Sequence, residues 1–234
     1  MKNLLKEIRR TRPTRTRRVA NRRLLLESLE GRQLLAAIPL PDGIVSWWTG
    51  DNTTADLLGR NDAALFNGGA YVTGKVGNGF NFDGIDDNLQ ATTVGLPIGS
   101  SDRTIELWTR IDQQVANEAF FASYGSPGTS NQVYTLGTQS NGRLFVSTWG
   151  PAVFGPTLQN NRWYHVAATN VGSSFKLYLD GVEVAAGNMP VDTPAGSTFW
   201  MGRQTMTTRG DSRRLDGMVD EVAVYNRALS GAEI

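Results

Sequence analysis

Short apolar and alternating runs recur along the chain from residue 44 onward, about every 8 to 15 positions, with turn residues between them. This spacing predicts an all-β protein built from short strands. The predicted strands are 44–48, 63–66, 79–82, 88–91, 104–111, 119–124, 133–136, 143–148, 163–169, 174–179, 182–186, 198–201 and 216–225. Pairs such as Asp83-Gly84, Asn141-Gly142 and Asp180-Gly181 mark turns between them. No long helix is predicted; only 229–234 is expected to begin a short helix, with Ser230 as its N-cap.

The alternation within single strands gives each strand one apolar face. Phe175 and Leu177 fall on the same side of their strand, and so do Ile105 and Leu107, with Glu106 on the opposite side. Strands of this kind suit two stacked antiparallel sheets with a filled layer between them. The sequence therefore predicts a two-sheet β-sandwich of the jelly-roll type.

Composition is consistent with one such domain and a tail. The chain has 234 residues, 40% of them hydrophobic, with six Trp, six Tyr and nine Phe, which is enough apolar material for a sizeable core. Cysteine is absent, so disulfides, thiol chemistry and cysteine zinc sites are excluded. This absence leaves the cellular compartment open.

The charge of the chain is divided between a basic start and an acidic remainder. Residues 1–37 hold 11 Lys and Arg against three Glu, whereas residues 38–234 hold 12 Lys and Arg against 19 Asp and Glu. Because phosphate binding needs a basic face, the acidic body argues against a nucleic-acid partner. It is compatible with calcium and with neutral sugars.

This division predicts a basic leader or targeting segment at 1–37, a linker at 38–43 and one folded domain at 44–234. The apolar residues 24–26 and 34–38 are separated by charge, so they do not form one continuous secretory core. No stretch approaches the ~18 apolar residues of a membrane span.

Part of the leader has a recognisable pattern. The stretch Leu-Glu-Ser-Leu-Glu-Gly-Arg-Gln-Leu-Leu-Ala-Ala at 26–37 resembles the Leu-Glu-x-Leu-Glu-x-Arg-x-Leu-Leu-Ser/Ala-Ala leader of many large exported bacterial proteins. The resemblance implies a secreted or cell-surface protein, with the leader removed near Ala36-Ala37. A disordered N-terminal arm is the alternative.

The domain itself also resembles a known family. Its strongest marks are Tyr178-Leu-Asp-Gly-Val182 and Gly217-Met-Val-Asp-Glu-Val222 near the end of the chain. The others, in order, are 43–48 with Asp51, 75–80, 82–88, 104–108, 141–144, 163–166 and 225–229. The ordered set is similar to the laminin-G-like, concanavalin-A-like jelly-roll domains of the bacterial subgroup. Members of that class mostly bind rather than catalyse, and the fold alone does not name a ligand.

The same resemblance implies a structural calcium ion at the edge of the sandwich. Such an ion is held by an Asp on the final strand and by an early carboxylate or carbonyl, which here correspond to Asp220, Asp51 and the carbonyl near Gly79. The alternative is that these carboxylates cap turns or accept backbone hydrogen bonds. The run 83–88 is also dense in oxygen ligands, but its spacing matches no known calcium loop.

Candidate catalytic groups are sparse. Glycosidases of this fold carry two Glu and an Asp on one strand as Glu-x-Asp-x-Glu, and no such run is present; Glu106 stands alone. His165 is the only histidine, and no Gly-x-Ser-x-Gly elbow accompanies it, so we expect it to be a packed, hydrogen-bonded core residue. The chain is therefore expected not to be an enzyme, with a glycoside hydrolase as the less favoured alternative.

Candidate ligand-binding residues are aromatic or cationic side chains expected on loops or edges, where a ring can stack on a sugar. They are Tyr124, Trp149, Phe154 and Arg203. Packing within the core or at a sheet edge is the alternative for these aromatic rings. Arg209-Gly-Asp211 matches a three-residue adhesion motif, a match that arises often by chance.

These observations favour a non-catalytic extracellular recognition or adhesion module that binds carbohydrate or a surface polymer. A structural spacer domain of a larger exported protein, without its own ligand, is the second hypothesis. The identity of the ligand and the oligomeric state do not follow from the sequence.

Overall fold

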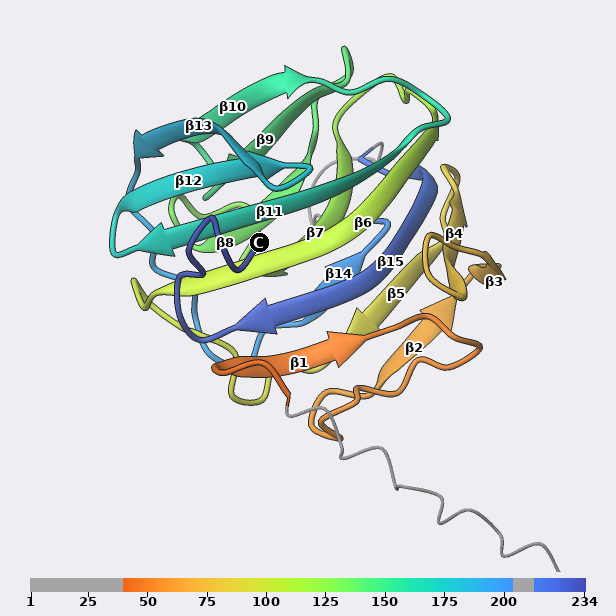
Figure 1. Ribbon diagram of the computed structural model, residues 1–234, viewed down its shortest axis with the longest axis horizontal. Coiled ribbons are helices and arrows are strands. Elements are labelled where there is room, and N and C mark those ends of the chain that lie inside the picture. Colours follow the sequence, from red (N-terminus) through yellow and green to blue (C-terminus); the bar gives the residue numbers. More distant parts are fainter. Residues whose placement is uncertain (1–39, 204–212) are drawn as a thin grey trace, which may run out of the picture. The chain divides into compact units, whose positions relative to one another are not determined.

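The residues that this computed structural model describes, 40–203 and 213–234, form fifteen strands in two antiparallel sheets that face each other (Figure 1). The described part is one compact unit, Leu40–Ile234. The leader predicted at 1–37, the start of the linker and the Arg209-Gly-Asp211 motif lie outside the described residues. Within the described residues, no helical segment has the length and apolarity needed to cross a bilayer.

Sheet A has eight strands. Their order is β13 (Val182–Asn188), β12 (Ser174–Leu179), β11 (Trp163–Val171), β6 (Arg103–Gln113), β15 (Asp216–Tyr225), β4 (Asn78–Asp83) and β3 (Ala70–Thr73), and β1 (Ile44–Trp48) also pairs with β15. The last strand of the chain therefore lies between β6 and strands from the start of the domain (Figure 1).

Sheet B has seven strands. Their order is β10 (Ala152–Thr157), β9 (Arg143–Ser147), β8 (Val133–Thr138), β7 (Ala119–Gly125), β14 (Phe199–Met201), β5 (Asn88–Ala91) and β2 (Ala63–Phe66). Each neighbouring pair is antiparallel.

The core fills the space between the two sheets, as the alternation predicts. Ile105, Leu107, Phe175 and Leu177 are fully buried. Trp48 of sheet A stacks on Phe199 of sheet B, with ring centroids 4.9 Å apart. Burying this continuous apolar layer is the main source of stability for a two-sheet fold, and the predicted all-β sandwich is confirmed.

Two strands were not predicted from the sequence, β3 and β10. Both lie at sheet edges. β10 contains Gly155-Pro156, and proline is tolerated at an edge because one side of an edge strand needs no ladder hydrogen bond. The segment 229–234, expected to begin a short helix, forms a single turn, in which the Glu233 and Ile234 N–H groups donate to the Ser230 carbonyl at 3.0 and 3.2 Å and Glu233 Oε2 accepts the Ser230 N–H at 2.8 Å.

Tyr124 occupies the core rather than an exposed loop or edge, so its predicted location was wrong. It is 1% exposed on β7, an interior strand, and its ring stacks near those of Tyr134 and Phe199. Its hydroxyl accepts a hydrogen bond from Arg103 Nη1 at 2.6 Å and donates to the Pro97 carbonyl at 2.9 Å. Arg103 is itself fully buried, so these hydrogen bonds compensate the loss of water around its charge.

Removing the Tyr124 hydroxyl should weaken the fold. Tyr124→Phe takes one acceptor from the buried Arg103 guanidinium, so we expect the free energy of unfolding to fall by about 1–2 kcal/mol in urea denaturation. Tyr71→Phe removes a hydroxyl from a half-buried ring on β3 and should change stability by less than about 0.5 kcal/mol. Equal stability of Tyr124→Phe and the wild type would contradict this account of the buried guanidinium.

Candidate functional site

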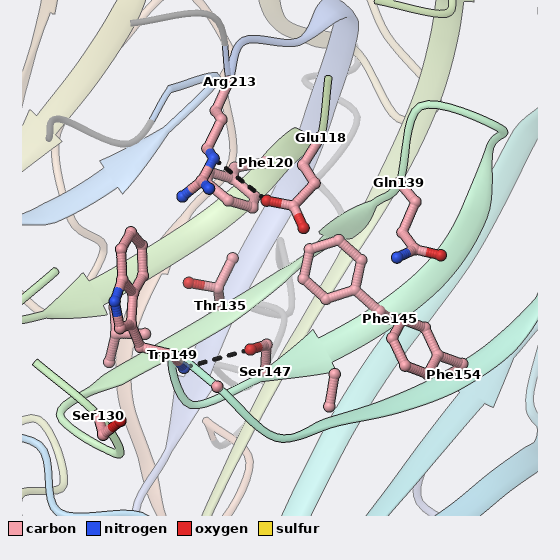
Figure 2. Close-up of a pocket in the computed structure, with 13 residues that line it drawn as sticks. Glu118, Phe120, Ser130, Thr135, Gln139, Phe145, Ser147, Trp149, Phe154 and Arg213 are labelled. Atoms are coloured by element: carbon pink, nitrogen blue, oxygen red, sulfur yellow. Dashed lines mark hydrogen bonds and ion pairs between the residues drawn. The ribbon is translucent and has the colours of Figure 1, made fainter. Parts of the chain in front are cut away.

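A pocket of about 480 Å³ lies on the outer face of sheet B, over β7, β8, β9 and β10 (Figure 2). Alternation along these strands creates it. Phe121, Tyr134 and Leu144 point into the core, and a residue next to each of them in sequence lines the pocket. The outward side chains that the strands supply include Phe120, Thr135, Phe145, Ser147 and Phe154.

Aromatic rings form much of the pocket surface. The rings of Phe120 and Phe145 meet edge to face at 6.0 Å, and Phe145 and Phe154 are tilted at 6.3 Å. Phe120 and Phe145 are buried by their neighbours, whereas Trp149 and Phe154 are only half-buried. The accessible rings of the pocket are therefore those of Trp149 and Phe154.

Trp149 is held in an unusual backbone conformation. Its φ of 70° lies in the left-handed region, which a bulky side chain rarely adopts. The Trp149 N–H donates to Ser147 Oγ at 3.2 Å, and Ser147 Oγ donates to the Pro151 carbonyl at 3.1 Å (Figure 2). Strained residues persist only where their surroundings impose them, and they gather at binding sites. The turn between β9 and β10 thus fixes the indole at the rim of the pocket.

The charges in the pocket are matched. Arg213 Nε lies 3.2 Å from Glu118 Oε2, and the Arg213 guanidinium sits 5.0 Å from the Trp149 ring centroid (Figure 2). It also lies 6.0 Å from the Phe120 ring centroid. The ion pair leaves the described lining with no net charge, and Gln139, Thr135 and Ser147 provide neutral polar groups. Such a pocket suits an uncharged ligand with both apolar faces and hydroxyl groups.

The structure brings together two of the four predicted ligand-binding residues. Trp149 and Phe154 line the same pocket. Arg203 follows β14, where it forms an isolated bridge with Arg214, and it does not line this pocket. Sequence reasoning missed Phe120 and Phe145, although the polar–apolar alternation of Arg143–Ser147 placed Phe145 outward.

The residues predicted to hold a metal also come together, at one edge of the sandwich. The register of β15 against β4 places Asp220 beside Gly79, where a Cβ on the glycine would lie 3.0 Å from Asp220 Cβ. Asp51 reaches the same loop, because its Oδ1 accepts a hydrogen bond from the Asn78 N–H at 2.8 Å. A Cβ at Gly77, where φ is 56°, would collide with Asp51 Oδ1. We call Asp51, Asp220 and the loop 74–79 the acidic corner.

The acidic corner has an unsatisfied carboxylate oxygen. Asp220 is fully buried; its Oδ2 accepts the N–H groups of Lys75 and Val76 at 2.8 and 2.9 Å, while its Oδ1 has no hydrogen-bond partner. Burial raises the pKa of Asp220, and the charge of Asp51 adds to that rise. The carboxylates of Asp51 and Asp220, the latter with its buried orphan oxygen, and the nearby backbone form a donor set of the oxygen type that a hard cation such as calcium prefers.

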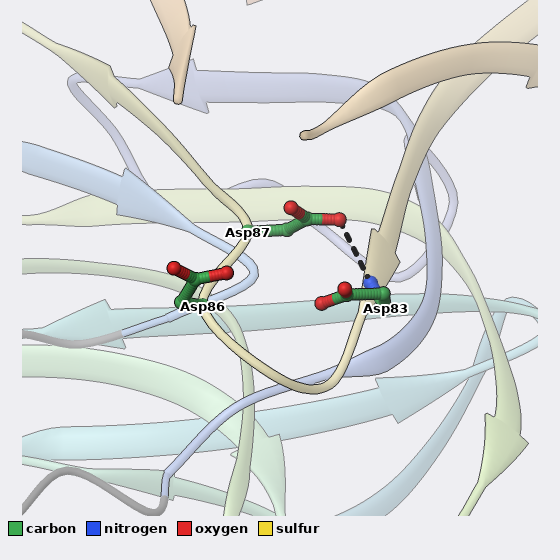
Figure 3. A group of neighbouring side chains, drawn as sticks. All are labelled: Asp83, Asp86 and Asp87. Atoms are coloured by element: carbon green, nitrogen blue, oxygen red, sulfur yellow. Dashed lines mark hydrogen bonds between the residues drawn. The ribbon is translucent and has the colours of Figure 1, made fainter. Parts of the chain in front are cut away.

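A second acidic group lies in the turn between β4 and β5, within the stretch 83–88 already noted for its oxygen ligands. One carboxylate oxygen from each of Asp83, Asp86 and Asp87 lies within 4.8 Å of the others (Figure 3). Asp87 Oδ2 accepts the Asp83 N–H at 3.0 Å, and Asp83 Oδ1 accepts the Ile85 N–H at 2.8 Å. These hydrogen bonds account for the fold of the turn, but Asp87 Oδ1, like Asp220 Oδ1, is buried without a hydrogen-bond partner, so this turn is the alternative place for a cation.

His165 does not belong to the core, and that prediction was wrong. Its strand alternates, and the core-facing residues of β11 are Tyr164, Val166 and Ala168. His165 instead lies on the outer face of sheet A, with Nε2 3.7 Å from Glu106 Oε2. Burial lowers the pKa of His165 and raises that of Glu106, which accepts a hydrogen bond from the Tyr225 hydroxyl at 2.7 Å.

Two antiparallel sheets over one core, with an aromatic pocket on an outer face, define a lectin-like β-sandwich. The chain belongs to the concanavalin A-like lectin/glucanases superfamily, whose laminin-G family model matches residues 83–234. A second family model, described as Planctomycete extracellular, matches residues 20–39. No curated protein matches the chain significantly.

Solved structures share this fold at low sequence identity. Domain 4 of AbnA, an extracellular GH43 arabinanase from Geobacillus stearothermophilus solved in complex with arabinotriose, is 18% identical with a TM-score of 0.64; the match covers 81% of this chain and 95% of that one. A Trypanosoma rangeli sialidase is 20% identical with a TM-score of 0.65, covering 82% of this chain and 32% of the sialidase. A botulinum neurotoxin type C structure, described by its interaction with two ganglioside molecules, is 15% identical with a TM-score of 0.61, covering 82% and 50%.

Glu106 should make the stability of the domain depend on pH. A carboxyl whose pKa is higher in the folded than in the unfolded state destabilises the fold above both values, and this penalty vanishes as the pH falls to the unfolded value. Glu106→Gln should therefore raise the free energy of unfolding at about pH 8 by on the order of 1 kcal/mol. In urea denaturation the difference should shrink toward zero near about pH 4.5.

The exposed Glu183, which pairs with Lys176 at 2.8 Å on the same sheet, provides the control. Glu183→Gln should not stabilise the domain at about pH 8, because an exposed pair contributes little and carries no burial penalty. A Glu106→Gln variant less stable than the wild type at high pH would show that the ionised form is favoured in the fold.

Proposed function

We propose that this domain is a non-catalytic carbohydrate-binding module that acts outside the cell, and that it binds a neutral saccharide in the pocket on sheet B. The observation that carries the proposal is the rim of that pocket, where Trp149 and Phe154 present half-buried rings beside neutral polar groups. Sugar rings have apolar C–H faces that pack on aromatic rings and hydroxyl groups that need polar partners.

The polar groups of the pocket suit sugar hydroxyls. Gln139 offers both a donor and an acceptor. The Ser147 hydroxyl already donates to the Pro151 carbonyl and the Thr135 hydroxyl is paired with Ser123 Oγ at 2.9 Å, so each mainly offers a remaining acceptor lone pair. Because Glu118 and Arg213 neutralise each other, a charged ligand would gain no net attraction. The solved relatives that contain arabinotriose or interact with gangliosides support a carbohydrate ligand, while their low identity leaves the particular sugar open.

The carboxylates argue for binding rather than hydrolysis. Glycoside hydrolysis by the common mechanisms uses a pair of carboxyl groups flanking the bond that breaks. Among the described residues, the pocket is lined by one carboxylate, Glu118, and Arg213 holds it in an ion pair. Glu106, the isolated carboxylate on β6, lies on the other sheet.

An extracellular location is supported by the match of residues 20–39 to the Planctomycete extracellular family model. It also agrees with the leader-like pattern of that region. Surface polymers and glycans are the partners that such a location makes accessible.

We further propose that the acidic corner binds one structural calcium ion. Asp220 and Asp51 would supply carboxylate oxygens, with a backbone carbonyl near Gly79 as a further ligand. The ion would neutralise two neighbouring carboxylates and satisfy Asp220 Oδ1. Extracellular modules bind calcium with Kd values of about 10⁻⁴–10⁻³ M, so the site would be filled outside the cell.

Saccharide binding should depend on the rings of the pocket. Titration calorimetry with neutral oligosaccharides, such as arabinotriose, xylotetraose and laminaritetraose, should find at least one that binds the wild type. Trp149→Ala and Phe154→Ala should each weaken that binding by about tenfold through loss of ring contact. Phe66→Ala is the matched control, because Phe66 is exposed on β2 at the opposite edge of the same sheet.

Binding that survives in both pocket variants would place the saccharide elsewhere. Folded protein that binds no saccharide of a broad glycan panel would favour the spacer domain. Release of reducing sugar from a polysaccharide by the wild type, lost in Glu118→Gln, would replace the module with a hydrolase.

Calcium should stabilise the domain through the acidic corner. At 100 times its Kd, calcium should add about 2.7 kcal/mol to the free energy of unfolding, seen as a rise in Tm that EDTA reverses. Asp220→Asn should abolish this rise and Asp51→Asn should reduce it. Asp86→Asn, in the turn between β4 and β5, should leave it intact; loss of the rise in Asp86→Asn alone would move the ion to that turn.

A further inference from the structure

A second cavity, of about 610 Å³, lies on the outer face of sheet A, on the opposite side of the core from the saccharide pocket. Strand register builds it: His165 on β11 lies opposite Trp108 on β6, and Trp163 lies opposite Arg110. The turn Asp180-Gly181 after β12 forms part of its wall.

Two indole rings line this cavity. Both Trp108 and Trp163 are half-buried, so part of each ring remains accessible. The His165 ring lies 5.2 Å from that of Trp108 at an angle of 55°, which fixes one side of the indole. A pair of tryptophans at the outer face of a sheet, rather than in the core, is a platform for a flat ligand.

Cations stand beside these rings. Lys75 Nζ lies 4.5 Å from the Trp108 ring centroid, and Arg162 also lines the cavity. The Arg110 guanidinium lies 5.7 Å from the Trp163 ring centroid. Among the described residues, no carboxylate comes within ion-pair distance of Lys75 Nζ. The exposed lysine therefore keeps a charge that a ligand can neutralise.

Among the described residues that line the cavity, which include Ile234, the one carboxylate side chain is already engaged. Asp180 Oδ1 accepts the His165 N–H at 2.9 Å, and its Oδ2 lies 3.3 Å from Arg162 Nη2. Nearby Glu106 accepts the Tyr225 hydroxyl at 2.7 Å. The side chains that line the cavity are therefore two cations and one carboxylate, an excess of one positive charge, with Glu106 outside the lining beside His165; the lining of the pocket on sheet B is neutral.

The backbone of Lys75 is held in place by the fold. Its backbone N–H donates to the buried Asp220 Oδ2 at 2.8 Å, so the loop 74–79 is anchored where it passes the cavity. Only the lysine side chain, lying over Trp108, remains free to meet a ligand.

We propose that this cavity is a second binding site, specific for a sugar residue that carries an anionic group, either a carboxylate or a sulfate ester. The sugar ring packs on the indole of Trp163, and its anionic group pairs with Lys75 and Arg162 on the rim. The site is independent of the neutral saccharide pocket, so the domain holds two different glycan segments on its two faces.

The test uses two anionic probes and, for the first of them, an uncharged derivative with the same rings. Tetragalacturonate carries carboxylates, its fully methyl-esterified form has the same rings without charge, and a sulfated galactan tetrasaccharide carries sulfate esters. Calorimetry should show binding of the carboxylate or the sulfate probe, no binding of the ester at the same concentration, and weaker binding as the salt concentration rises. The probe that binds shows whether the site takes a carboxylate or a sulfate ester.

Variants then locate the binding. Lys75→Ala should weaken it by about fivefold, the upper end for one exposed ion pair, and Trp163→Ala by about tenfold. Lys176→Ala is the matched control, because Lys176 is an exposed lysine of sheet A outside the cavity and pairs with Glu183. Lys75 is exposed, so its replacement leaves the fold intact even if Trp163→Ala lowers the Tm.

Variants of each site should leave binding at the other site unchanged. Trp149→Ala should leave binding of the anionic probe unchanged, and Lys75→Ala should leave binding of a neutral saccharide unchanged. The proposal is overturned if neither anionic probe binds, if the ester binds equally, or if Lys75→Ala and Trp163→Ala retain full affinity. A neutral saccharide lost only in Trp149→Ala would still uphold the pocket on sheet B in each of those cases.

Discussion

The structure depends on how the last strand, β15, pairs along its length. Its first half, from Asp216 to Val219, pairs with β4, and its second half, from Val222 to Tyr225, pairs with β1 on the same edge. The other edge pairs with β6 throughout. A bulge between Asp220 and Ala223, with Glu221 at a φ of 52°, separates the two halves. A bulge redirects a strand and re-aims its side chains, and here it lets one strand close the sheet against two partners.

The acidic corner is a consequence of that bulge. Where β15 changes partner, the start of β4 and the chain leaving β1 must meet, and these segments carry Gly79 and Asp51. Asp220 is the last paired residue before the bulge, buried between them, and its carboxylate accepts the N–H groups of Lys75 and Val76 in the loop 74–79. Three residues separated by up to about 170 positions therefore converge for a reason of topology, whether or not an ion joins them.

The alternation of apolar and polar residues made most of this architecture predictable, because it decides which face of a strand is buried. It also explains the failures. Tyr124 looks like the end of an exposed strand, but β7 is flanked by β8 and β14, which no local pattern reveals. His165 has apolar neighbours in the sequence. The alternation of side chains along its strand nevertheless places the imidazole outside the core. Asp51 and Asp220 were found through family likeness, whereas Phe120 was missed because its strand is apolar on both faces.

The two outer faces of the sandwich differ because sheets A and B contribute different outward side chains. On sheet B the outward positions are aromatic and neutral, and the one ion pair is closed within the pocket. On sheet A they are aromatic and cationic, and Lys75 belongs to the loop that Asp220 anchors. A movement of Asp220 at the acidic corner would therefore shift Lys75, and with it the cavity on sheet A, through one backbone hydrogen bond. No described residue lines both the pocket on sheet B and the cavity on sheet A, so the two faces present separate surfaces.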